Sequence, residues 1–250
     1  MPLNRKLLVV IVTLTALRGA VVLAQLSAAD RSAIERYRTA LRAAEAASSP
    51  GGLEAAFAAF GAMQAALMRT PDGGTATVVE SLSDEEFDRL QRDVPSALIS
   101  REEVVFVRPD PDYFARLAAV RGDEADRAFF SAMQATYPDA VWPSYVTRQT
   151  DDSGCTRFGS MSLVETYRAW SAFQRRYPER YGEAAARETN AVLDALTRST
   201  CACGAMAAVE QELDSFIRLF PDSSAQPLVK ERLDAVRGGR PDIRARCVSG

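Results

Sequence analysis

The sequence contains no histidine. This absence excludes Ser-His and Cys-His catalytic dyads, and it excludes zinc sites that use an imidazole ligand. Lysine occurs only at Lys6 and Lys230, and a proline occupies the position where a Ser-x-x-Lys nucleophile ending at Lys230 would need its serine. Glycine-rich phosphate-binding loops are missing as well. The catalytic chemistry that remains open to the chain is that of carboxylates.

The chain also lacks an excess of positive charge, because its 30 basic residues are matched by 33 acidic ones. The resulting net charge of −3 gives no basic footprint of the kind that binds nucleic acid. Apolar residues make up 47% of the 250 residues, which is enough for a sizeable core without help from cross-links. We therefore expect a globular protein with no nucleic-acid partner, no metal and no cofactor.

The one long apolar run stands near the start of the chain and is too short to span a membrane. Arg5 and Lys6 precede it, it extends over Leu7–Leu17, and Arg18 interrupts it. Small residues follow, so residues 1–24 have the three parts of a secretory signal peptide. We expect this signal to be cleaved, which leaves a periplasmic or secreted protein that is not embedded in the membrane. A retained membrane anchor is the alternative.

Four cysteines remain after that cleavage: Cys155, Cys201, Cys203 and Cys247. An even number in an exported chain predicts two disulfides. Cys201 and Cys203 are too close for a thioredoxin-like pair, a metal site would need further ligands, and a bond between the two would close a strained ring. We therefore expect one of them to bond to Cys155 and the other to Cys247. Which cysteine takes which partner stays open.

Apolar side chains recur every three or four residues along most of the chain, which predicts an all-α fold of helical hairpins or a helical bundle. The expected helices cover residues 27–47, 53–68, 83–94, 110–120, 123–136, 163–176, 183–197, 205–220 and 227–237. The irregular stretch 137–159 divides an N-terminal region, 25–136, from a C-terminal region, 137–250. Both regions could still belong to one continuous domain.

Local signals mark several of these helix starts. Ser83 and Glu86 form a capping-box pattern, and a second such pattern stands at Ser162 and Glu165. Residues 104–107, "VVFV", are the only strand-like run that the pattern indicates. Since no second run stands nearby to pair with it, we expect these residues to form an extended connector.

The C-terminal region contains a weak internal repeat. Phe173 and Tyr177-Pro178 match Phe216 and Phe220-Pro221 at a constant offset. In each copy an aromatic residue ends a helix and proline prevents its continuation, so that a second helix can turn back.

The stretch "FIRLFPDSSAQPLVKERL" resembles the tetratricopeptide-like repeats of periplasmic envelope proteins, in which an aromatic-Pro-x-Ser turn joins two helices. Ser223 and Ala225 stand where that pattern places them, whereas Arg180 replaces the serine in the first copy. The resemblance covers about 165–237 and implies a concave surface that binds a protein partner of the cell envelope, without catalysis. An ordinary helical bundle is the alternative.

Large aromatic residues are the candidate partner-binding residues, because exposed rings often anchor protein partners. This set consists of Trp142, Tyr145, Trp170 and Tyr181. Rings at helical spacing are also typical of a core, so both interpretations stand.

Carboxylate chemistry supplies the competing hypothesis of a cell-wall glycan-cleaving enzyme. Glu80-Ser81 is a pair that such enzymes often show, although the rest of their signature is missing. The acidic runs at 110–112 and 151–152 lack the alternating oxygen ligands of a calcium loop. The sequence thus favours an exported, non-catalytic binding or scaffold protein. The glycosidase alternative would require two buried carboxylates with raised pKa values that face one another across a cleft.

Overall fold

The computed structural model describes residues 26–46, 51–102, 104–137, 139–141, 144–146 and 155–247. The predicted signal peptide lies outside these residues, as does Trp142. The helices of the described part are α1 (Ala28–Ala46), α2 (Gly52–Leu67), α3 (Asp84–Asp93), α4 (Pro111–Arg121), α5 (Glu124–Thr136), α6 (Ser162–Arg176), α7 (Gly182–Arg198), α8 (Met206–Leu219) and α9 (Gln226–Arg237). The strands are β1 (Ala97–Arg101), β2 (Val105–Pro109), β3 (Asp139–Val141) and β4 (Ser144–Val146). The prediction of a mainly helical fold is confirmed.

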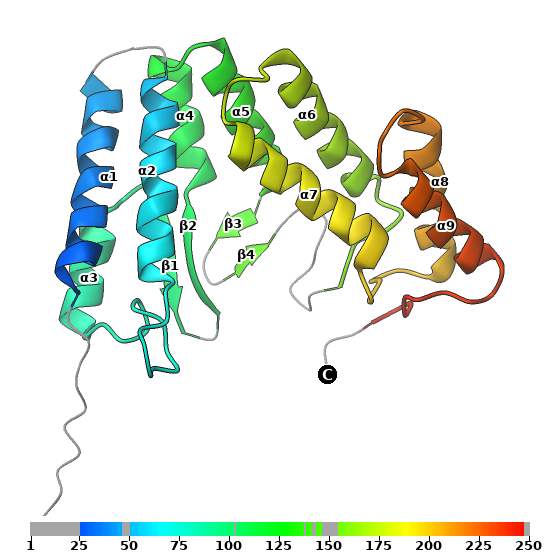
Figure 1. Cartoon of the computed structure of the whole chain (residues 1–250), viewed down its shortest axis with the longest axis horizontal. Helices are drawn as coiled ribbons and strands as arrows, with labels where there is room; N and C mark the ends of the chain where they lie inside the picture. The colour runs from blue at the N-terminus through cyan, green and yellow to red at the C-terminus, as the bar shows by residue number, and fades with distance from the viewer. Residues whose placement is uncertain are drawn as a thin grey trace, which may run out of the picture.

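Consecutive helices pack in pairs and follow one another along the molecule (Figure 1). The pairs are α1 with α2, α4 with α5, α6 with α7, and α8 with α9. Each predicted helix is present with ends close to the expected positions, and the helical hairpins are therefore confirmed. Pairs of this kind also occur in ordinary bundles, so the tetratricopeptide-like resemblance stays a prediction.

The two copies of the internal repeat end their first helices in the same backbone conformation. Tyr177 has φ −132° and ψ 60°, and Phe220 has φ −131° and ψ 60°. Val94, which lies outside the repeat but also precedes a proline, has φ −131° and ψ 64°. A following proline disfavours the helical conformation of the preceding residue and so explains all three cases without a shared repeat.

One of the two predicted capping boxes is confirmed, and the other is wrong. The hydroxyl of Ser83 accepts the Glu86 N–H at 3.3 Å, and the Glu86 carboxylate accepts the Ser83 N–H at 3.0 Å. Ser162 is instead the first residue inside α6, which follows Met161 in the left-handed conformation, and no side chain of the N-cap residue caps the helix. The start of α6 is capped from α8 by Glu212.

Glu212 is fully buried and accepts three backbone N–H groups at the start of α6. Its carboxylate oxygens lie 2.9 Å from the nitrogens of Gly159 and Met161 and 3.2 Å from that of Val164. The first turn of a helix has N–H groups without intrahelical partners, and its dipole favours a negative charge. Glu212 therefore satisfies these donors and fixes α8 against α6.

The expectation that residues 104–107 form an unpaired connector is wrong. β1 pairs with β2 in an antiparallel register that sets Ile99 opposite Val107, and both side chains are buried. β1 was missed because Ser100 interrupts its short apolar pattern and Ser96 stands directly before it, yet both serines are buried. Ser96 is satisfied by a hydrogen bond between its hydroxyl and that of Tyr37, a contact with α1 that no local pattern indicates.

The buried apolar side chains of the described residues form two hydrophobic cores. The first lies among α1 to α5, the β1–β2 hairpin, the end of α6 and the start of α7, and includes Tyr37, Phe60, Phe114, Phe129, Phe130 and Trp170. The second includes Leu163, Val192, Leu196, Leu213, Phe216 and Val229. Since α6 and α7 contribute to both, the two cores meet within this helical pair.

Candidate functional site

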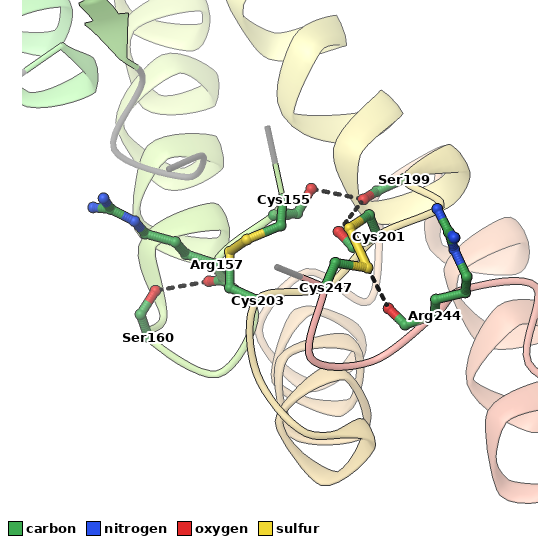
Figure 2. Close-up of a disulfide and its surroundings, with 9 residues drawn as sticks. Cys155, Arg157, Ser160, Ser199, Cys201, Cys203, Arg244 and Cys247 are labelled. Atoms are coloured by element: carbon green, nitrogen blue, oxygen red, sulfur yellow. Dashed lines mark hydrogen bonds between the residues drawn. A yellow bond between two sulfur atoms is a disulfide. The ribbon is translucent and has the colours of Figure 1, made fainter. Parts of the chain in front are cut away.

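The Cys-x-Cys segment lies at a corner where two distant parts of the chain meet (Figure 2). Cys203 is bonded to Cys155, with 5.1 Å between their Cα atoms, and Cys201 is bonded to Cys247, with 5.8 Å between theirs. Each cysteine of the pair thus has one distant partner, as the sequence predicts, and the structure supplies the pairing that the sequence left open.

Backbone hydrogen bonds hold the same corner on both sides. Thr156 donates to the carbonyl of Cys201 at 2.9 Å and accepts the N–H of Cys203 at 3.0 Å. On the other side, the Ala202 N–H donates to the carbonyl of Arg244 at 2.8 Å. Ala202 is itself buried in the second core. The corner is therefore a structural junction with all four sulfur atoms in disulfides.

A buried arginine connects the C-terminal tail to the end of α7. The Arg232 guanidinium donates to the carbonyl oxygens of Leu196, at 2.8 Å, and Ser199, and it pairs with Asp242 at 3.1 Å. The last carbonyls of a helix have no intrahelical donors, so a cation is stabilising there. Burial lowers the pKa of Arg232, while Asp242 acts in the opposite direction.

Within the described residues, a cavity with an apolar floor lies between α2 and the start of α7. We call it the α2–α7 groove. Its volume is about 520 Å³, and its lining consists of Glu54, Phe57, Ala58, Phe60, Gly61, Ala62, Gln64, Pro109, Tyr181, Gly182, Glu183, Ala184 and Arg187. Volumes of this size are typical of ligand-binding pockets.

Aromatic packing fixes the floor of the groove. The ring of Phe57 lies edge-to-face against Phe114, at 5.7 Å between centroids, and against Phe129, at 5.2 Å. Tyr181 stacks on Phe129 at 3.9 Å. Interlocked aromatic rings of this kind resist displacement, so the floor is a rigid apolar surface.

The α2 wall of the groove is bare because Gly61 has no side chain. A Cβ atom at Gly61 would meet nothing within 4 Å, and its backbone is ordinary helix. Glycine inside a helix costs about 1 kcal/mol relative to alanine. Neither packing nor backbone conformation requires glycine here, and its one structural consequence is a wider groove.

Arg180 and three carboxylates lie beside the start of α7, at the end of the groove that Glu54 lines. Arg180 donates to Glu54 at 2.6 Å, to Asp123 at 2.7 Å and to Asp126 at 2.8 Å. Burial acts to lower the pKa of Arg180, but the hydrogen bonds and charges of the carboxylates outweigh it and raise the pKa. Tyr181 donates its hydroxyl to Asp126 at 2.8 Å, and burial raises the pKa of this phenol. The cluster joins α2, α5 and the turn before α7.

Two of the predicted partner-binding residues belong to the first core. Trp170 is 0% exposed and donates its indole N–H to Thr136 at 2.9 Å, and Tyr181 is 4% exposed. Both rings therefore pack in the first core, and Tyr181 at the same time lines the α2–α7 groove. Tyr145 lies in β4, and Trp142 is outside the described residues.

Glu80 does not have the environment of a general acid. Its exposed carboxylate accepts the N–H and the hydroxyl of Thr77, each at 2.7 Å, and these hydrogen bonds lower its pKa.

Asp110 caps α4 by accepting the N–H groups of Asp112, at 2.9 Å, and Tyr113, at 3.2 Å. Within the described residues no group of three metal-ligating side chains is placed to hold an ion.

Glu188 is a carboxylate whose pKa is raised. Burial causes this rise, against the opposing effects of Tyr137, Arg108 and Arg187. Its carboxylate accepts the Tyr137 hydroxyl at 2.8 Å. The groups that act on Glu188 are thus a phenol and two cations, whereas a glycosidase requires a second carboxylate across the cleft.

The groove itself was not predicted from the sequence. Its walls come from α2 and α7, which are far apart in the chain, and five of its thirteen lining residues are glycine or alanine, which carry no local signal. The available signal was the cost of Gly61 within a strongly helical run.

No protein-family model, no curated protein and no solved structure matches this chain. In the part of the chain that the structure describes, none of the helices is both long and apolar enough to cross a bilayer.

Proposed function

We propose that this protein is an exported, non-catalytic binding protein of the bacterial cell envelope, and that a segment of its protein partner docks in the α2–α7 groove. The observation that carries the proposal is the groove's construction. It has a rigid apolar floor formed by Phe57 and its aromatic neighbours, and a wall left bare by Gly61 at a cost in helix stability.

The shape of the groove supports a chain segment as the occupant. Its α2 wall extends from Glu54 to Gln64, which corresponds to about 15 Å along a helix. A peptide in an extended conformation covers that length with about five residues. The length of the α2 wall therefore accommodates a peptide of about five residues.

The disulfides support export. Two disulfides join segments that are 48 and 46 residues apart, and such bonds persist in oxidising compartments. Together with the signal pattern of residues 1–24, they favour a periplasmic or secreted location.

The glycosidase alternative has less support from the described residues. Its candidate Glu80 is exposed, with a lowered pKa, and the partly buried acid Glu188 accepts a hydrogen bond from Tyr137 and is acted on by the charges of two arginines. Glu188 also does not line the groove.

Site-specific photo-crosslinking tests the proposal. A photoreactive amino acid replaces Ala58, which lines the groove, or Ala207, which is exposed on α8 outside it. We expect a protein adduct in envelope extract from position 58 and none from position 207. Ala62→Arg, which places a long side chain in the groove, should remove the adduct, whereas Ala43→Arg on the exposed face of α1 should not. Equal adducts at both positions, or no adduct at position 58, would contradict the proposal.

A further inference from the structure

The α7 end of the groove carries an excess of negative charge. Arg180 supplies one positive charge to three carboxylates, those of Glu54, Asp123 and Asp126. Glu54 also lines the groove, so part of this excess borders the space in which an occupant would lie. Arg180 balances one of these three negative charges, and the other hydrogen bonds that the carboxylates accept come from uncharged donors, namely backbone N–H groups and the Tyr181 hydroxyl.

The remaining charges of the groove do not offset this excess. Glu183 and Arg187 line the groove from α7, are both exposed and carry opposite charges. Gln64 and the apolar lining add no charge. The groove and its adjoining cluster are therefore acidic at one end and apolar along the floor.

We infer that the α2–α7 groove binds a segment in which a cationic side chain stands beside apolar ones, with the cation at the Glu54 and Glu183 end and the apolar side chains on Phe57. This inference rests on the proposed function and names the chemistry of the partner. Charge complementarity carries it, because unlike charges at the edge of an interface favour association and like charges oppose it. An acidic segment would place further negative charge beside partly compensated carboxylates.

Three labelled peptides of eight residues test this inference by fluorescence anisotropy with the disulfide-bonded protein. They share two central leucines and differ only in the residues on either side of them, which are lysine, glutamine or glutamate. We expect the lysine peptide to bind about tenfold more tightly than the glutamate peptide at low salt, with a smaller difference at high ionic strength. Ala62→Arg should abolish binding of the lysine peptide.

Glu183→Gln gives the matched test of charge within the groove. We expect it to weaken binding of the lysine peptide about two- to fivefold and to leave the glutamine peptide unchanged. Glu231→Gln is the control, because it removes the same charge from the exposed surface of α9, outside the groove. Equal effects of both variants on the lysine peptide would overturn the assignment of the cation to this end of the groove.

The remaining outcomes separate the inference from the proposed function. If the glutamate peptide binds as tightly as the lysine peptide, and Ala62→Arg removes both, then the inference is overturned and the groove remains a binding site. If no peptide binds while Ala58 still gives its crosslinked adduct, the inference is likewise overturned and the proposed function stands. If neither peptide binding nor a crosslink is observed, both are overturned.

Discussion

Arg180 lies 2.8 Å from the carboxylate of Asp126, and this contact joins the turn before α7 to the start of α5. Asp126 is buried, so removal of Arg180 would leave its charge without a guanidinium partner. We expect Arg180→Gln to lower the free energy of unfolding by about 3 kcal/mol. Arg198→Gln, which breaks an exposed pair within α7, should cost less than about 0.5 kcal/mol. Urea unfolding measures both, and equal costs would contradict the structural role of Arg180.

The same cluster gives stability that depends on pH. Burial acts to raise the pKa of Asp123, but hydrogen bonds from the Asp126 N–H and Arg180 outweigh it, so the folded pKa lies below 3.8. A lowered folded pKa gives stability that is present above the unfolded pKa and is lost as the pH falls toward the folded value. We expect the urea midpoint to fall between pH 6 and pH 3, and to fall less in Arg180→Gln. An equal loss in both proteins would exclude the cluster as its source.

Glu212 gives a prediction about helix capping across the fold. Glu212→Gln keeps the shape but removes the charge that three N–H groups of α6 contact, so we expect a loss of about 2 kcal/mol. Ser162→Ala removes the hydroxyl that the local pattern assigned to the cap, and we expect a smaller loss than for Glu212→Gln. If chemical denaturation shows a larger loss of unfolding free energy for Ser162→Ala than for Glu212→Gln, the local capping box at Ser162 does cap the helix.

The disulfide pairing predicts a thiol count for double variants. The double variant Cys155→Ser with Cys203→Ser removes one complete bond, so the denatured protein should contain no free thiol. Cys155→Ser with Cys201→Ser removes one partner from each bond, and we expect two reactive thiols. This comparison is needed because no arginine or lysine separates Cys201 from Cys203, which keeps both in one tryptic peptide. The opposite result would show the opposite pairing.

Loss of either disulfide should also destabilise the protein to a similar extent. The bonds close loops of 48 and 46 residues, for which the chain-entropy model gives about 4 kcal/mol each. We expect the two matched double-serine variants to unfold at similar urea concentrations, both below the unmodified protein. A large difference between them would show that one bond stabilises mainly through contacts of the folded corner.

The helices could be predicted from the sequence because their signals are local. Apolar periodicity, the Ser83 cap and the proline after Tyr177 act within a few residues, and all of them have the expected structural result. The features that were missed depend on residues far apart. Ser96, directly before β1, is buried against Tyr37 of α1, and the start of α6 is capped by Glu212 from α8.

The candidate site was predictable only in part, for the same reason. The even number of cysteines and their spacing predicted that Cys201 and Cys203 each bond to a distant cysteine. Which cysteine takes which partner depends on how Thr156 and Arg244 pair with the backbone of residues 201–202, and the sequence does not show this. The groove follows from the packing of α7 beside α2, and its floor residue Phe57 has the same apolar spacing as any core residue.

The most direct test of the central claim is the crosslinking yield at Ala58 in the Gly61→Leu variant. Leucine favours helix and would extend from the bare wall into the α2–α7 groove. Because leucine favours helix and meets open space, this variant should unfold at no lower urea concentration than the unmodified protein. If the partner binds in the groove, the variant should nevertheless lose the partner adduct. A variant that is equally stable and retains the full adduct would contradict the claim.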